Sequence, residues 1–403
     1  MACTSKHDDA ETGTAGEVFG AFLKLGCTSF GGPIAHLGYF RDELVARRRW
    51  LDDRAYAELV GLCQFLPGPA SSQAGFALGL MRAGPLGGLA AWTAFTLPSA
   101  ILMFGFALVA ADLSGPLAAA AIHGLKIAAV AVVAQALVGM ARTLTPDLPR
   151  LSLAAAAMGG MLIAAAPAAL IAVILVGALA GVGFGKAGKV ELQAPIGWAP
   201  RRRTGFACLA LFAGLLSLLP LASSWQGSFA LADIFYRAGA LVFGGGHVVL
   251  PLLREGLVPG WMNDGQFLAG YGAAQAVPGP LFTLSAYLGA LAEPDAPVAG
   301  ALTALTMIFL PGLLLTAGAM PFRAAIAQSA TARAAISGVN AAVVGILAAA
   351  LYDPLWTSGI LSPPDAMIAI AGFGLLVRLQ VPPLAVVLGS VAASIGAAVL
   401  AGP

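Results

Sequence analysis

The stretch that decides the fold is FLKLGCTSFGGPIAHLGYFRDELV, from Phe22 to Val45, because it recurs as FYRAGALVFGGGHVVLPLLREGLV, from Phe235 to Val258. The two stretches align without a gap. An aromatic residue, a basic residue, a glycine, Phe-Gly-Gly, an arginine and an acidic residue stand in register. Self-similarity of this kind indicates that the chain is built from two related halves.

A second repeated block follows the first in both halves. QFLPGP (Gln64–Pro69) is answered by QAVPGP (Gln275–Pro280), and further along the chain Gly124 is answered by Gly338. The blocks occur in the same order in each half, which favours a duplication over chance similarity or low complexity.

The composition places both halves in a membrane. Of the 403 residues, 59% are hydrophobic and 10% are charged, whereas a soluble domain carries about 25% charged residues. Long uncharged stretches reach the roughly 20 residues that a spanning helix needs. We therefore expect an all-α, polytopic membrane protein whose partner is the lipid bilayer. The net charge of +2 gives no reason to expect nucleic acid.

Glycine and proline interrupt the apolar segments at equivalent places in the two halves. Gly31-Gly32-Pro33 and Pro67-Gly68-Pro69 divide segments that are too short to span the membrane twice. Proline removes a backbone donor and glycine weakens a helix, so each motif is expected to end one helix and begin another. Such broken helices at matching positions are a sequence pointer to a transport site. The expected half-length pairs are 17–30 with 34–47, 54–66 with 70–82, 229–243 with 247–257, and 264–277 with 281–292.

The distribution of Lys and Arg predicts how the halves are oriented. The cluster Arg47–Arg54, the loop Arg142–Arg150 and the linker Lys186–Arg203 are basic and should be cytoplasmic. The loop Gly256–Gly265, equivalent to the first cluster, contains no Lys or Arg and should face outward. This pattern predicts inverted-topology repeats with a cytoplasmic N-terminus and a periplasmic C-terminus. A parallel duplication is the alternative, and it would place several arginines outside.

The layout that follows has five parts. Inverted repeats in transporters give alternating access to a site near the midplane, and we expect the same here. The parts are a polar cytoplasmic N-terminus (1–16), the first half (17–184), a basic cytoplasmic linker (185–205), a connecting transmembrane helix (206–222) and the inverted second half (229–403). The expected spanning helices within the halves are about 85–111, 115–141, 150–166, 168–184, 297–320, 333–352, 364–380 and 382–401.

The starts of the half-length helices are candidate anion sites. A helix N-terminus presents unpaired N–H groups and a partial positive charge, which suits an oxyanion. The alternative is that the polar side chains there only satisfy freed backbone groups. The candidate binding residues at the breaks are Ser29, Gly31, Gly32, Gln64, Pro67, Gly68, Ser71, Ser72, Gly244, Gly245, Gln275, Pro278, Gly279 and Thr283.

Charged and titratable residues within the half-length helices add three further candidates. Lys24 and Arg237 occupy the same place in the repeat and are expected to converge on a doubly charged ligand, unless they snorkel to the headgroups. His247 follows the second glycine run and could bind the anion, carry a proton or pack in the core. Asp42 and Glu255 each follow an arginine, so a local ion pair is the simplest expectation for them.

Enzymatic motifs are absent from the sequence. There is no HExxH, no Walker A motif, no Gly-x-Ser-x-Gly elbow and no Cys/His cluster at metal-ligand spacing. We expect neither an enzyme nor a cofactor or metal. An intramembrane enzyme is the alternative from a different class, and it would need a nucleophile with a base, or two carboxylates, inside the membrane.

The motifs Phe30–Pro33, Gln64–Pro69, Phe243–His247 and Gln275–Pro280 together resemble those of the chromate ion transporter family in its long, two-domain form. The resemblance covers both halves, and it implies a bacterial inner-membrane protein that exports chromate and confers chromate resistance. Sulfate, a tetrahedral dianion of similar size, is the alternative substrate. Coupling to protons and a homodimeric state stay open.

Overall fold

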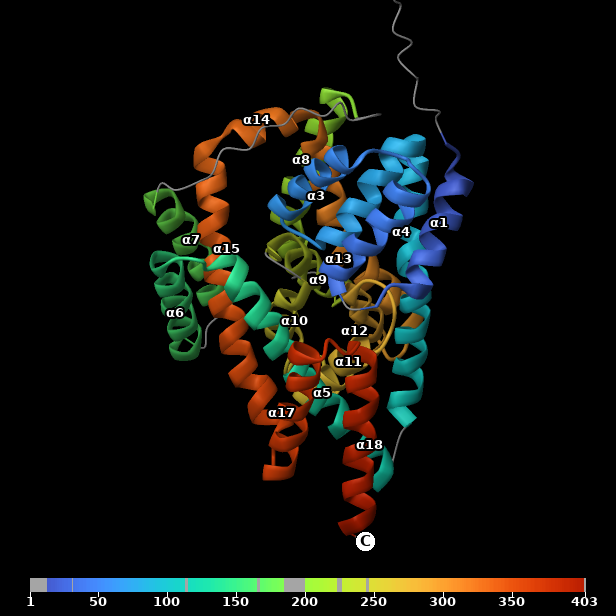
Figure 1. Cartoon of the computed structure of the whole chain (residues 1–403), viewed down its shortest axis with the longest axis vertical. Helices are drawn as coiled ribbons and strands as arrows, with labels where there is room; N and C mark the ends of the chain where they lie inside the picture. Colours follow the sequence, from blue (N-terminus) through green and yellow to red (C-terminus); the bar gives the residue numbers. More distant parts are fainter. Residues whose placement is uncertain are drawn as a thin grey trace, which may run out of the picture.

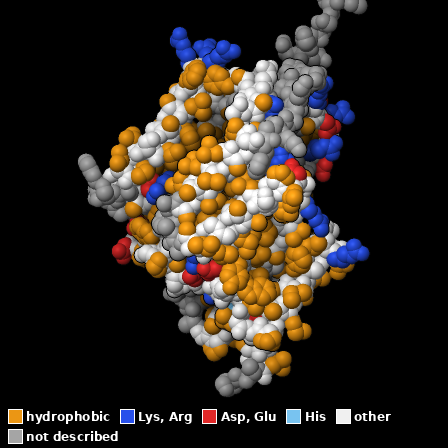
Figure 2. Space-filling model, turned by 90° about the vertical axis from the view of Figure 1, so that its left-hand side faces the viewer, with side chains coloured by type: hydrophobic (Ala, Val, Ile, Leu, Met, Phe, Trp, Pro, Cys, Tyr) orange, Lys and Arg blue, Asp and Glu red, His pale blue; other side chains and the backbone are white. Residues whose placement is uncertain are grey.

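The computed structural model describes residues 13–30, 32–112, 115–164, 167–184, 200–222, 227–243 and 246–401, and all regular structure in these residues is helical. Within this part of the chain, six helices are long and apolar enough to cross a membrane. Figure 2 shows a broad hydrophobic surface with Lys and Arg side chains gathered toward its upper end and its edges. The expectation of an all-helical polytopic membrane protein is confirmed.

The first half contains the expected pairs of short helices. Helix α4 is continuous where two helices were expected, but its backbone leaves helical dihedral angles at Ala83 and Gly84, so it has two limbs. The elements are α1 (Ala15–Thr28), α2 (Gly32–Phe40) running into the π-helix η1 (Arg41–Arg47), α3 (Asp53–Phe65), α4 (Ala70–Asp112), α5 (Pro116–Leu144), α6 (Leu148–Ile163) and α7 (Pro167–Phe184).

The second half repeats this order after the connecting helix α8 (Arg202–Ala222). The limbs that are joined in α4 are here separate helices, α12 and α13. The elements are α9 (Gly227–Leu241), η2 (Gly246–Val248), α10 (Val249–Leu257), α11 (Asp264–Ala274), η3 (Leu281–Thr283), α12 (Leu284–Ala292), α13 (Pro297–Ala319), η4 (Met320–Phe322), α14 (Arg323–Gln328), α15 (Ala330–Ala350), η5 (Leu351–Trp356), α16 (Thr357–Gly359), α17 (Pro363–Arg378) and α18 (Pro383–Ala401).

In each half, two helices pack against a long helix of the other half. Helix α5 packs against α17 and α18, and the equivalent helix α15 packs against α6 and α7 (Figure 1). Glycine at the crossing makes both contacts close. A Cβ atom on Gly124 would lie 2.6 Å from the Cα atom of Val391 in α18, and one on Gly338 would collide with the Gly177 carbonyl oxygen in α7. Small residues that let backbones approach are typical of helix packing in membranes.

Equivalent polar contacts tie each pair of half-length helices together. The Asp52 side chain accepts from the Ala55 amide to cap α3, and Asn263 caps α11 in the same way. The arginines that precede these caps form ion pairs with the first acid of the following helix. Arg41 lies 2.7 Å from Asp53, and Arg254 lies 2.7 Å from Asp264. The expectation that Asp42 and Glu255 pair with the preceding arginines is therefore wrong, because the arginines bind the first acid of the next helix.

Candidate functional site

The helix breaks of the two halves meet through a reciprocal pair of backbone hydrogen bonds. The Gly68 amide donates to the Val242 carbonyl at 2.7 Å, and the Gly279 amide donates to the Ser29 carbonyl at 2.8 Å. Gly68 is equivalent to Gly279 in the repeat, and Val242 to Ser29. Contacts that are made in both directions by equivalent residues are what a two-fold axis between the halves produces. The Pro-Gly-Pro loop of each half is thus completed by the other half.

Glycine is required at the centre of both loops. Gly68 has a φ of +123° and Gly279 one of +96°, in the region that side chains rarely adopt. A Cβ atom on Gly68 would lie 3.1 Å from the Cα atom of Gly312, and one on Gly279 would lie 2.8 Å from the hydroxyl of Ser99. Ser99 and Gly312 are also equivalent in the repeat, so the close approach is the same on both sides.

The first break is lined by buried polar side chains. His36 is fully buried in α2, and its Nδ1 lies 3.4 Å from the Ser71 hydroxyl at the start of α4. The Gln73 amide donates to the Pro67 carbonyl at 2.8 Å. Some atoms here are buried without a hydrogen-bond partner among the described residues, which is rare and calls for water or a ligand. They are Ser29 Oγ, His36 Nε2, Ser72 Oγ, Gln73 Oε1 and Thr96 Oγ1.

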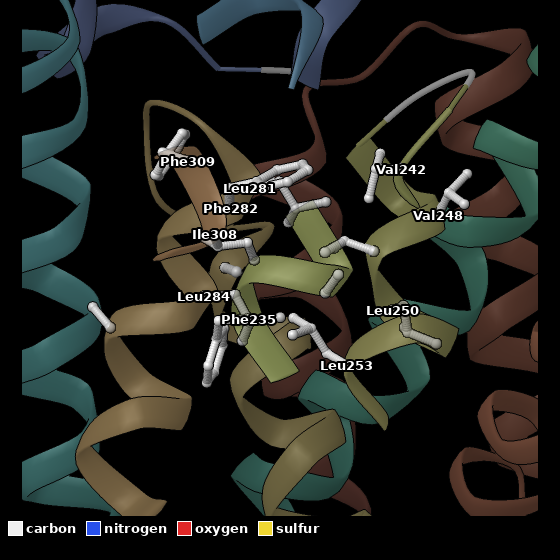
Figure 3. Close-up of a cluster of buried hydrophobic side chains, with 14 of the residues drawn as sticks. Phe235, Val242, Val248, Leu250, Leu253, Leu281, Phe282, Leu284, Ile308 and Phe309 are labelled. Carbon is white, nitrogen blue, oxygen red and sulfur yellow. The ribbon is translucent and has the colours of Figure 1, made fainter. Parts of the chain in front are cut away.

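The second break is apolar at the equivalent positions. Val249 stands in place of His36, Phe282 in place of Ser71 and Leu284 in place of Gln73. Figure 3 shows Phe282 and Leu284 within a cluster of buried hydrophobic side chains from α9, α10 and α13. The Thr283 hydroxyl, in place of Ser72, donates to the Pro280 carbonyl at 2.8 Å and is thereby satisfied. The two breaks are alike in backbone geometry and different in chemistry.

The structure places the two repeated cations in ion pairs within their own halves. Lys24 Nζ lies 2.6 Å from Glu43, which also binds Arg48 at 2.9 Å. Arg237 pairs with Asp233 one helical turn before it, and it lines a cavity whose walls do not include Lys24. The expected convergence of both cations on one ligand is not the arrangement of these described residues.

The remaining candidates are distributed around the breaks. His247 Nδ1 lies 2.7 Å from the Tyr271 hydroxyl, so this histidine is anchored to α11. Gln64 is exposed at the end of α3, while the Nε2 of Gln275 is buried without a partner in the part of the chain that is described. Pro67 offers its carbonyl to Gln73, and Pro278 lies next to Gly279 in the second loop. Gly31, Gly244 and Gly245 lie outside the described residues.

Sequence reasoning missed two residues of the candidate site, Thr96 and His36. A signal for His36 was present, because a histidine in an apolar half-length helix stands three residues after Gly31-Gly32-Pro33 while its repeat partner is a valine. The internal repeat by itself marks only the residues that match between the halves. The structure shows that the residues which differ between the halves carry the polarity.

Half-length helices that break and meet between two repeats define a multi-pass membrane transporter. This chain belongs to the chromate transporter family, whose model matches residues 16–182 and 229–396, one match in each half. The expectation of two family halves is confirmed, and the protein belongs to a transporter family, not to an enzyme family.

Curated relatives cover most of the chain. The chromate transport protein of Pseudomonas aeruginosa is 28% identical over 348 residues, which cover 84% of this chain and 80% of the relative. The probable chromate transport protein of Synechococcus elongatus is 30% identical over 335 residues, with 82% of each chain covered. The chromate transport protein of Cupriavidus metallidurans is 27% identical over 377 residues, with 92% of this chain and 90% of the relative covered. No solved structure matches the chain.

Proposed function

We propose that the protein exports chromate across the bacterial inner membrane by alternating access, with the anion bound at the break of the first half. The observation that carries the proposal is the group of buried, unpartnered hydroxyl and imidazole groups of Ser29, His36, Ser72 and Thr96. A tetrahedral oxyanion accepts hydrogen bonds on every face, and hydroxyl and imidazole donors supply them. The family's named members are chromate transport proteins, which supports chromate as the anion.

Backbone electrostatics favour an anion at this place. Helix α4 begins at Ala70, directly after the Pro-Gly-Pro loop, so its first N–H groups and its positive dipole end lie beside Ser71 and Ser72. An anion held by N–H groups and hydroxyls, without a permanent counter-ion, is bound firmly enough to be selected and still released. This combination suits a transport site better than a storage site.

The reciprocal contact of the halves supports alternating access. The two bonds Gly68–Val242 and Gly279–Ser29 join the breaks across the two-fold axis. The distribution of Lys and Arg supports an axis that lies in the membrane plane, so that the halves are inverted. A rocking motion of one half against the other then exposes the first break to each side in turn.

The test is uptake of labelled chromate into inside-out membrane vesicles. Export in the cell corresponds to uptake in this preparation, so vesicles with the protein should accumulate chromate above vesicles without it, and an imposed membrane potential should drive it. Unlabelled sulfate, added as a competitor, tests whether sulfate rather than chromate is the substrate. Uptake that sulfate abolishes at concentrations where unlabelled chromate has little effect would assign the site to sulfate, and no uptake of either would contradict the proposal.

A further inference from the structure

A cavity of about 580 Å³ lies between α7 of the first half and α9 and α10 of the second. Three charged residues line it, Asp233 and Arg237 from α9 and Glu255 from α10. The other lining residues are aliphatic or glycine. A cavity of this make-up has one cation and two acids in a setting of low polarity, where each charge acts strongly on the next.

Asp233 is the unusual group in this cavity. Its side chain is 3% exposed, and one carboxylate oxygen pairs with Arg237. The other oxygen, Oδ1, is buried and has no hydrogen-bond partner among the described residues. A buried carboxylate that is only half satisfied is costly, so it depends on the Arg237 guanidinium or on a proton. Arg237 is 44% exposed and is therefore able to turn toward a ligand in the cavity.

The first half has no such pair. Gly20 stands where the second half has Asp233, and Lys24, in place of Arg237, reaches Glu43 instead. The carboxylate–guanidinium pair is thus particular to the second half, just as the polar helix break is particular to the first. The two halves have thus diverged, with neutral hydrogen-bonding groups at the break of the first and an ionic pair in the second.

Few other titratable groups act on Asp233. Helices α7 and α13 carry none. On α10, Arg254 is committed to Asp264, so Glu255 is the group that this helix adds to the cavity. The remaining groups on the helices packed against α9, and on α9 itself, are Tyr236, which donates to the Phe212 carbonyl, Tyr287, which donates to the Gln266 carbonyl, and Cys208, Arg202 and Arg203 on α8.

We propose that this cavity is a second station for the transported oxyanion, separate from the first break, where the anion binds together with one proton. The anion takes the Arg237 guanidinium, and the proton neutralises the Asp233 carboxylate that the guanidinium leaves. The proposal rests on the oxyanion transport proposed above and adds its coupling. The proton comes from the solution on the side where the anion enters and leaves with it on the other. Each exported dianion then carries a single net negative charge outward, and export is still driven by an inside-negative potential.

The experiment uses the purified full-length protein in liposomes with the membrane potential clamped. It is run at alkaline pH, where chromate is fully ionised and brings no proton of its own. A chromate gradient is imposed, and chromate flux and internal pH are followed together. The wild-type protein should move one proton with each chromate. Asp233→Asn cannot take up this proton, so the proton-to-chromate ratio of the flux that remains should fall at least about tenfold. The matched control, Asp264→Asn, removes an acid from an ion pair outside this cavity and should keep the wild-type ratio.

The outcomes separate this inference from the proposed function. Chromate flux without proton movement in the wild-type protein, or an unchanged ratio in Asp233→Asn, overturns the inference and leaves chromate export standing. No chromate flux in the wild-type protein contradicts the export itself. If Asp233→Asn does not insert, labelling by a hydrophobic carbodiimide, which reacts with protonated buried carboxyls, decides the matter in the wild-type protein. Chromate should increase labelling at Asp233, and labelling that chromate leaves unchanged overturns the inference.

Discussion

At the scale of single residues, Ser72 is the sharpest test of the proposed binding site. Its hydroxyl is buried and has no partner in the described part of the chain, so it is free to donate to an anion. A hydrogen bond to a charged group contributes about 1.5–3 kcal/mol. Ser72→Ala should therefore raise the chromate concentration for half-maximal transport by about tenfold or more, with little change in the amount of inserted protein. Transport kinetics normalised to quantified protein measure this.

Ser285→Ala is the matched control in the second half. Ser285 is also fully buried, but its hydroxyl donates to the Phe282 carbonyl at 2.8 Å and is not available to a ligand. Its removal should leave the half-saturation concentration unchanged. If the two alanine variants behave alike, the unpartnered hydroxyl of Ser72 is not a ligand to the anion.

The sequence predicted the polar residues at the breaks but not which of them are free to bind. Ser72 and Thr283 occupy the same place in the repeat, and only the structure shows that the Thr283 hydroxyl already donates a hydrogen bond to the Pro280 carbonyl. Lys24 and Arg237 looked equivalent for the same reason, yet their acidic partners come from different places, a neighbouring half-length helix in one case and the same helix in the other. Hydrogen-bond partners depend on tertiary packing, which a repeat pattern does not contain.

At the scale of helices, the breakers predicted the half-length pairs within a few residues because proline and glycine act locally on the backbone. The continuity of α4 was not predictable, since its two limbs stay aligned across the irregular dihedral angles at Ala83 and Gly84. Nor did the sequence say which helices cross between the halves. The match of Gly124 with Gly338 was visible in the sequence. The structure shows that each glycine allows a close crossing of two helices from different halves.

The crossing of α15 and α7 gives a prediction about stability. A side chain on Gly338 collides with the backbone of Gly177 and Gly181, and overpacking of this kind costs about 1–3 kcal/mol. Gly338→Val should lower the thermal unfolding midpoint of the detergent-solubilised protein. Gly374→Val is the control, because nothing lies within 4 Å of a Cβ atom at Gly374 in α17. Equal midpoints for the two variants would show that the close crossing does not support the fold.

At the scale of the whole molecule, the inverted arrangement that we propose for the halves places two equivalent loops on opposite sides of the membrane. In a protein freed of its native cysteines, a cysteine at Gly260, which is exposed after α10, should react with an impermeant thiol reagent added to the periplasmic side. One at Arg48, after η1, should react only from the cytoplasmic side. Inversion predicts opposite sides because the first loop is rich in arginine and the second has none. Labelling of both from one side would mean parallel halves.

The reciprocal hydrogen bonds between the breaks also bear on how the protein is made. The Ser29 carbonyl and the Gly68 amide enter the bilayer long before the ribosome has translated Val242 and Gly279, their partners. Backbone groups left unmatched at membrane depth cost several kcal/mol each. The newly synthesised first half must therefore be held by the insertion machinery, or in contact with water, until the second half arrives. The two helix breaks of this protein can therefore be completed only after Gly279 has been synthesised.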